Sequence, residues 1–135
     1  VFGGEQLRPN LHVKDYCNSV QLLMESSSDL VKNQIFNIGY QNLSIRNIAL
    51  VVKKVVESKF PNRNPIEIFT TESDDNRSYH INSDKIKKIL GYSPKYTVEN
   101  AVEELSDAFI ENKIPNSFED DKYFNVKRLI RLNVK

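Results

Sequence analysis

Segments that favour β-strands are scarce in this sequence, and their scarcity limits the folds that it can adopt. Three short runs have the length and composition of strands, at residues 5–8, 34–38 and 66–70. The segments between them are longer and amphipathic, which predicts helices. A complete doubly wound α/β domain needs several more strands than this. We therefore predict a helix-rich α/β fold with a few short strands.

Four segments carry apolar residues at helical spacing. The first begins near Val13, and the others follow Ser44, Ser83 and Thr97. Each of these three hydroxyl residues is expected to cap its helix, because a side-chain oxygen accepts a hydrogen bond from an orphan amide of the first turn. Gly91 is expected to close the third helix in the left-handed conformation.

Composition excludes several classes of protein. The net charge is +1, from 19 basic and 18 acidic residues, whereas nucleic-acid binders usually carry a large positive excess. No apolar run approaches the roughly 20 residues needed to cross a bilayer, so we expect no membrane partner. The one cysteine, Cys17, suits a reducing compartment, which we take to be the cytoplasm, and its place on the inner helical face predicts a small core residue. The cysteine and two histidines show no spacing typical of a metal site.

The order of several motifs resembles the extended short-chain dehydrogenase/reductase family, in particular its nucleotide-sugar epimerases and dehydratases. A glycine turn at residues 3–4 precedes Arg-Pro-Asn-Leu-His-Val-Lys-Asp at residues 8–15. Phe-Asn-Ile-Gly at residues 36–39 is similar to a late strand of the family. Asp-Asn-Arg-Ser-Tyr at residues 75–79 then leads to a lysine-bearing segment that ends in Leu-Gly-Tyr-Ser-Pro. Together these motifs cover roughly residues 1–127.

This resemblance implies the C-terminal, substrate-binding part of a Rossmann-type enzyme. Residues 1–115 would form the substrate-binding region together with late elements that pack on the Rossmann part, and residues 116–135 would form a C-terminal tail. The parent protein would be an NAD-dependent isomerase or lyase acting on a nucleotide-diphosphate sugar, and this chain alone would be inactive. Its partner would be the missing N-terminal Rossmann part. The sugar, the nucleotide, the choice of epimerase or dehydratase and a homodimer of the parent protein all stay open.

Three residues are candidates for substrate binding. In the family, the arginine that matches Arg8 reaches the diphosphate, and arginine suits this role because its planar fork forms paired hydrogen bonds to phosphate oxygens. The alternative for Arg8 is an ordinary surface salt bridge. Arg77 is a second candidate for the same phosphates, and its alternative is a solvated loop arginine paired with Asp74 or Asp75. Gln6 is a candidate for the ribose or the base edge, or else a polar residue on an exposed strand face.

Other polar residues near these motifs receive structural roles. His12 is expected to be a packed, hydrogen-bonded histidine at a strand-to-helix junction, with no role in proton transfer. Asp15 is expected to stabilise the N-terminus of its helix, where a carboxylate and the helix dipole attract. Tyr79 and His80 are candidates for lining the pocket, although a core position is the better expectation for Tyr79.

The catalytic features of the family are not expected in this chain. None of its 4 glycines forms Gly-x-Gly-x-x-Gly, so NAD would be bound mainly by residues absent from the chain. Tyr123 and Lys127 reproduce the Tyr-x-x-x-Lys spacing of the family's catalytic pair. That pair lies upstream of all the motifs found here, so we interpret the match as coincidental and expect no catalytic residue.

Two other functions are also open. The chain is an alternative candidate for a non-catalytic protein-interaction module that keeps this fold. Nucleic-acid binding by the chain would depend on its clustered basic residues, although such clusters usually form a solvated face of a protein. These residues are Lys85, Lys87, Lys88, Lys127, Arg128, Arg131 and Lys135.

If the helices pack against a missing part, they should expose apolar faces when the chain is produced alone. We therefore predict that the isolated chain self-associates or binds a hydrophobic dye. Dye fluorescence and light scattering measure this directly. A monomeric, cooperatively folding chain that leaves the dye dark would contradict the prediction.

Overall fold

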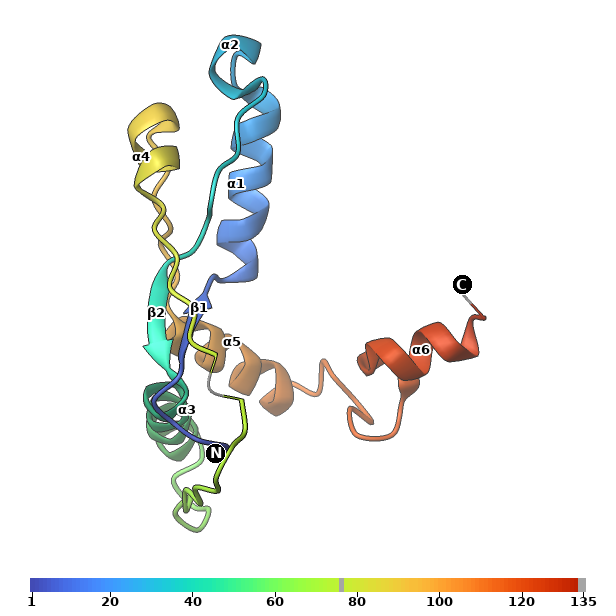
Figure 1. Ribbon diagram of the computed structural model, residues 1–135. Helices are drawn as coiled ribbons and strands as arrows, with labels where there is room; N and C mark the ends of the chain where they lie inside the picture. The colour runs from blue at the N-terminus through green and yellow to red at the C-terminus, as the bar shows by residue number, and fades with distance from the viewer. Residues whose placement is uncertain (76, 134–135) are drawn as a thin grey trace. The chain divides into compact units, whose positions relative to one another are not determined.

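The computed structural model describes residues 1–75 and 77–133 (Figure 1). Asn76 of the expected arginine motif and Lys135 of the basic cluster lie outside the described residues. The chain forms two compact units, Val1–Glu103 and Glu104–Lys135, which are described separately below. The first unit contains all three candidate binding residues. The predicted boundary between residues 115 and 116 stays a prediction.

The four helices that the sequence predicts are present, and the expected helix-rich α/β class is confirmed, whereas three further short helices were not predicted. Ser44 caps its helix as expected, since its hydroxyl accepts a hydrogen bond from the Asn47 amide at 3.2 Å. Gly91 ends the third predicted helix with a φ of 69°. The helices are α1 (Val13–Glu25), α2 (Ser28–Val31), α3 (Ile45–Lys59), α4 (Asp84–Leu90), α5 (Val98–Ile110), the 3₁₀ helix η1 (Asp121–Tyr123) and α6 (Asn125–Arg131).

The two other predicted caps behave differently from each other. Thr97 and Asn100 form a reciprocal capping box, in which each side chain accepts a hydrogen bond from the other residue's amide. Ser83 stands at the N-cap position of α4 but makes no capping hydrogen bond. Its hydroxyl instead accepts from the Gly39 amide and donates to the Gly39 carbonyl, each at 2.9 Å. Ser83 therefore fastens α4 to the segment before the second strand.

The sheet has two antiparallel strands, β1 (Leu7–Asn10) and β2 (Gln41–Ser44), with Leu7 opposite Ser44 and Asn10 opposite Gln41. The first predicted strand is thus displaced by two residues. The strand expected at residues 34–38 is wrong, because an extended segment becomes a strand only by pairing, and none of the described residues pairs with it. Residues 66–70 also form no strand, although the adjacent Thr71 makes an isolated parallel bridge with Phe2.

The apolar face of α1 is largely exposed. Tyr16, Val20 and Met24 lie on this face, and Met24 is 82% exposed. They border a shallow hollow of about 500 Å³ together with Cys17. Cys17 is itself exposed, so the prediction that it is a core residue is wrong. The helical spacing identified the apolar face, but the sequence could not show that the chain leaves it uncovered.

The polar core of the first unit is built around Asp15, which is 1% exposed. Its carboxylate accepts hydrogen bonds from the backbone amides of Lys95 and Tyr96, at 3.0 and 2.8 Å. The Tyr92 hydroxyl donates to the Asp15 carbonyl at 2.6 Å, and burial raises the pKa of this hydroxyl. Asp15 does lie in the first turn of α1, as predicted, but it also fastens that turn to the segment between α4 and α5.

The second unit contains the tail, which the sequence did not assign to elements. Asp121 of η1 accepts hydrogen bonds from Arg128 and Arg131 of α6, at 3.4 and 2.6 Å. Several apolar side chains of the second unit are exposed, among them Phe118 and Ile130. Within the described residues, no helix has the length and hydropathy needed to span a membrane.

We predict that Asp15→Ala destabilises the protein by about 2–4 kcal/mol, because two part-buried backbone amides lose their buried acceptor. Asp29→Ala is the matched control, since Asp29 also lies in the first turn of a helix but is exposed. The control should cost about 1 kcal/mol or less. Urea unfolding monitored by circular dichroism measures both values. Equal midpoints for the two variants would contradict the role of Asp15.

Candidate functional site

The candidate site forms along the edge of β1 that β2 leaves open. There the Leu7 amide donates to the Ser78 hydroxyl at 3.0 Å, and the Leu7 carbonyl accepts from the Tyr79 amide at 3.1 Å. Further along, the Asn42 side chain bonds both the amide and the carbonyl of Ile81, at 2.9 and 3.0 Å. Residues 77–81 are thereby fixed beside a strand that lies about 70 positions earlier in the sequence.

Arg8 lies on β1 and is held by backbone carbonyls as well as by an acid. Its Nη1 donates to the carbonyls of Leu7 and Arg77, at 3.0 and 2.5 Å. Its Nη2 lies 3.4 Å from an Asp75 carboxylate oxygen. The guanidinium also lies over the Tyr79 ring, 5.4 Å from its centroid. With a side chain only 27% exposed, Arg8 is fixed in place at the edge of the sheet.

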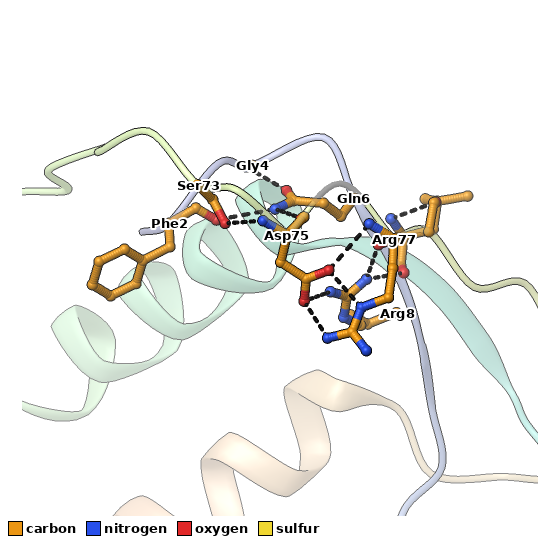
Figure 2. Close-up of polar contacts among 9 residues, drawn as sticks. Phe2, Gly4, Gln6, Arg8, Ser73, Asp75 and Arg77 are labelled. Atoms are coloured by element: carbon orange, nitrogen blue, oxygen red, sulfur yellow. Dashed lines mark hydrogen bonds and ion pairs between the residues drawn. The ribbon is translucent and has the colours of Figure 1, made fainter.

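Arg77 reaches the same carboxylate from the neighbouring segment, as Figure 2 shows. Its Nε and Nη2 donate to the two Asp75 oxygens, at 2.7 and 2.9 Å, and its amide donates to one of them at 3.2 Å. This is the paired fork that arginine forms with carboxylate or phosphate. The side chain of Arg77 is 72% exposed. The structure therefore brings both candidate arginines to one anionic group.

Gln6 lies one residue before β1, and its side chain makes three hydrogen bonds within the chain. Its Nε2 donates to the carbonyls of Phe2 and Asp75, at 3.3 and 3.1 Å, and its Oε1 accepts from the Gly4 amide at 2.6 Å. Gln6 thus ties the glycine turn to the loop that carries Asp75. Its contact with a ribose or base stays a prediction.

Asp75 is the electrostatic centre of this cluster. Its pKa is lowered from 3.8 to about 2, mainly by the hydrogen bonds from the Arg77 side chain and amide, with a smaller effect from Arg8. In return Asp75 raises the pKa of the Arg77 guanidinium, to which Tyr79 adds a smaller contribution. The pairing of Arg77 with Asp75 is the alternative that the sequence left open. Pairing in a chain without ligand is compatible with either role, so phosphate binding stays a prediction.

Of the other polar residues near the motifs, His12 has the structural role predicted for it, whereas Tyr79 does not. His12 is buried at the junction of β1 and α1, where its Nδ1 accepts from the Lys14 amide at 3.1 Å and its ring lies 5.1 Å from that of Tyr96. This confirms the structural role predicted for it. Tyr79 is not a core residue, because its ring lies beneath Arg8 and is about half exposed. The sequence could not show this, since Tyr79 lies in a loop, where the spacing of apolar residues does not indicate which side chains are buried. His80 is exposed and borders a separate hollow of about 280 Å³.

The second unit contains the Tyr-x-x-x-Lys match, and its two residues have other neighbours. The Lys127 ammonium lies over the Phe124 ring at 4.3 Å, while Lys122 lies over the Tyr123 ring at 4.8 Å. Among the described residues, no three His, Cys, Asp or Glu side chains gather as metal ligands.

Sequence reasoning missed the residues that assemble the site. Asn42 holds Ile81, and Ser78 holds Leu7. Asn42 lies outside every motif, and Ser78 lies within the motif at residues 75–79 but was given no role of its own. If a strand had been predicted at the position of β2, a polar asparagine within it would have drawn attention to Asn42. Ser78 follows Arg77 directly, and only the spatial pairing with β1 reveals its role.

Comparisons with known proteins support the resemblance. The chain is 26% identical to dTDP-glucose 4,6-dehydratase of Xanthomonas campestris pv. campestris across 84% of its own length, and the protein of strain B100 matches equally well. The resemblance to the extended short-chain dehydrogenases/reductases is confirmed. The chain also shares its fold with part of the PbgP3 protein from Burkholderia pseudomallei, whose crystal structure matches 79% of the chain with a TM-score of 0.62 and 22% identity. No protein-family model matches.

The chain spans about a third of these proteins, namely 34% of each dehydratase and 32% of the PbgP3 chain. About two thirds of the length of each of these proteins therefore lies outside the part that this chain matches.

We predict that the Asp75 carboxyl titrates near pH 2 and that Arg77→Ala returns its midpoint toward 3.8. Because the pKa is lowered in the folded state, the pairing stabilises the fold above about pH 3.8, and this contribution is lost as the pH falls through about 2. Carboxyl carbon chemical shifts measured by NMR report the midpoint. Arg8→Ala should move it less, and an Asp75 midpoint near 3.8 in the unmodified protein would contradict the described geometry.

Proposed function

We propose that this chain is the nucleotide-sugar-binding part of an NAD-dependent nucleotide-sugar dehydratase or epimerase. The observation that carries the proposal is the convergence of Arg8 and Arg77. These residues are separated by 69 positions, yet their guanidinium groups bind one carboxylate at the edge of β1. Both lie in motifs that resemble those of the family, and the similarity to dTDP-glucose 4,6-dehydratase covers most of the chain.

The chemistry of the cluster suits a diphosphate. A carboxylate and a phosphate present the same kind of anionic oxygen acceptor to a guanidinium fork. In the proposed complex, Arg8 and Arg77 bind the two bridged phosphates of the substrate, while Gln6 keeps the glycine turn against the loop of Asp75. Binding energy from this remote group positions the sugar for reaction elsewhere on the enzyme.

The residues of this chain do not fit NAD. A dinucleotide site needs a glycine-rich turn between a strand and a helix N-terminus. Gly3 and Gly4 instead precede β1, Gly39 precedes β2, and Gly91 ends α4. When bound, NAD supplies hydride transfer, and we assign its binding to a part of the enzyme outside this chain. We derive no step of that transfer from the residues described.

Two structural features support docking of the chain on a larger enzyme. The apolar face of α1 is exposed over several turns. The extended segment at residues 34–38 pairs with no described strand, and Ile35 within it is 81% exposed. An apolar helix face and an unpaired extended segment are what a chain presents when it completes a sheet and its covering layer. The chain also spans only about a third of the dehydratases that it matches, which agrees with this interpretation.

A non-catalytic interaction module is the second candidate, favoured by the same exposed apolar face. The reading frame upstream of Val1 distinguishes the two, because a glycine-rich strand–turn–helix and a Tyr-x-x-x-Lys motif there would indicate the enzyme. Nucleic-acid binding has less support from the described basic residues. Lys85 bonds the Ile35 carbonyl at 2.8 Å, and Arg128 and Arg131 pair with Asp121.

Calorimetric titration of the full-length gene product with dTDP and UDP tests the proposal. We expect binding of at least one of them, weakened about tenfold to a hundredfold by Arg8→Ala, because a charge-assisted hydrogen bond contributes about 1.5–3 kcal/mol. The matched control is Arg63→Ala, which removes an exposed arginine of the same unit.

Circular dichroism establishes that both arginine variants fold, and Arg8→Lys provides a second variant that keeps the charge but loses the fork. Affinity unchanged by Arg8→Ala, or lowered equally by Arg63→Ala, would overturn the proposed role of Arg8.

A further inference from the structure

The two arginines of the site are held in different ways. Arg8 donates to two backbone carbonyls, and its contact with Asp75 is a single one at 3.4 Å. Loss of that contact would leave its carbonyl bonds intact. Arg8 therefore stays in place whether or not Asp75 is engaged elsewhere.

Arg77 depends on Asp75 much more strongly. Its guanidinium donates two hydrogen bonds to the Asp75 carboxylate, at 2.7 and 2.9 Å (Figure 2). Tyr79 contributes a weaker interaction. The Arg77 side chain is also far more exposed than that of Arg8, at 72% against 27%. An ion pair this exposed is weak, so a stronger anion can displace the carboxylate.

The backbone of Asp75 is fixed independently of the arginines. The Gln6 side chain donates to its carbonyl at 3.1 Å, and its amide donates to the Ser73 hydroxyl at 3.2 Å. The carboxylate therefore keeps its place when a guanidinium leaves. This makes Asp75 a stationary acceptor beside the proposed diphosphate site.

We propose that Asp75 is a positioning residue that holds Arg77 beside Arg8 in the ligand-free protein and releases it to the diphosphate on binding. This inference rests on the proposed function. Arg8 is the fixed arm of the site, and Arg77 is the arm that exchanges one anionic partner for another. The exchange limits affinity, because the diphosphate must first compete with an internal carboxylate.

Titration of the full-length gene product with dTDP tests this inference, because the inference predicts whether Asp75→Asn raises or lowers the affinity for dTDP. Asp75→Asn weakens the internal competitor, so the dissociation constant for dTDP should fall by about two- to fivefold, which matches the value of an exposed ion pair. Arg77→Ala should weaken binding, and in that background Asp75→Asn should no longer improve it. A purely structural role of Asp75 would instead make Asp75→Asn weaken binding.

Asp74→Asn is the matched control, because it removes an exposed carboxylate one residue away. If Asp74→Asn improves binding as much as Asp75→Asn, or if the gain persists with Arg77→Ala, the effect is general electrostatics and the inference is overturned. If the unmodified protein binds neither dTDP nor UDP, the proposed function itself fails. Binding that depends on Arg8 but is weakened by Asp75→Asn overturns the positioning role alone.

Discussion

The edge of β1 that β2 leaves open is the constraint on which the candidate site depends. Residues 77–81 occupy this edge through backbone bonds to Leu7 and through the side chain of Asn42, and in doing so they deliver Arg77 to Arg8. The contact is irregular, partly because Pro9 has no amide to donate on β1. Without this pairing, the two arginines would belong to unrelated segments of the chain, and no anionic group would be shared between them.

A second constraint acts in the interior, where Asp15 accepts two backbone amides from the segment that joins α4 to α5. A buried carboxylate is costly unless its hydrogen bonds are satisfied, so this polar contact fixes one arrangement of α1 and that segment. Apolar burial contributes less, since only Val55, Ile86 and Tyr92 are buried hydrophobic residues among those described. The first unit thus combines a small polar core with an exposed apolar face on α1.

Much of this fold could be predicted from local signals. Periodicity placed α1, α3, α4 and α5, and Ser44 and Gly91 marked two of their ends, because caps and periodicity act within a few residues. The prediction of a strand at residues 34–38 was wrong for the opposite reason, since a strand forms by pairing with a segment that can be distant in the sequence. Cys17 was placed on the correct helical face, but whether that face is covered depends on what packs there. At the site, the resemblance selected Arg8 and Arg77. It did not reveal the roles of Asn42 and Ser78, because these roles depend on which segments lie side by side in space.

A crystal structure of the full-length gene product with bound dTDP tests the central claim most directly. The account predicts that the guanidinium groups of Arg8 and Arg77 both lie within hydrogen-bonding distance of the diphosphate. A diphosphate bound elsewhere, with both arginines still paired to Asp75, would contradict it.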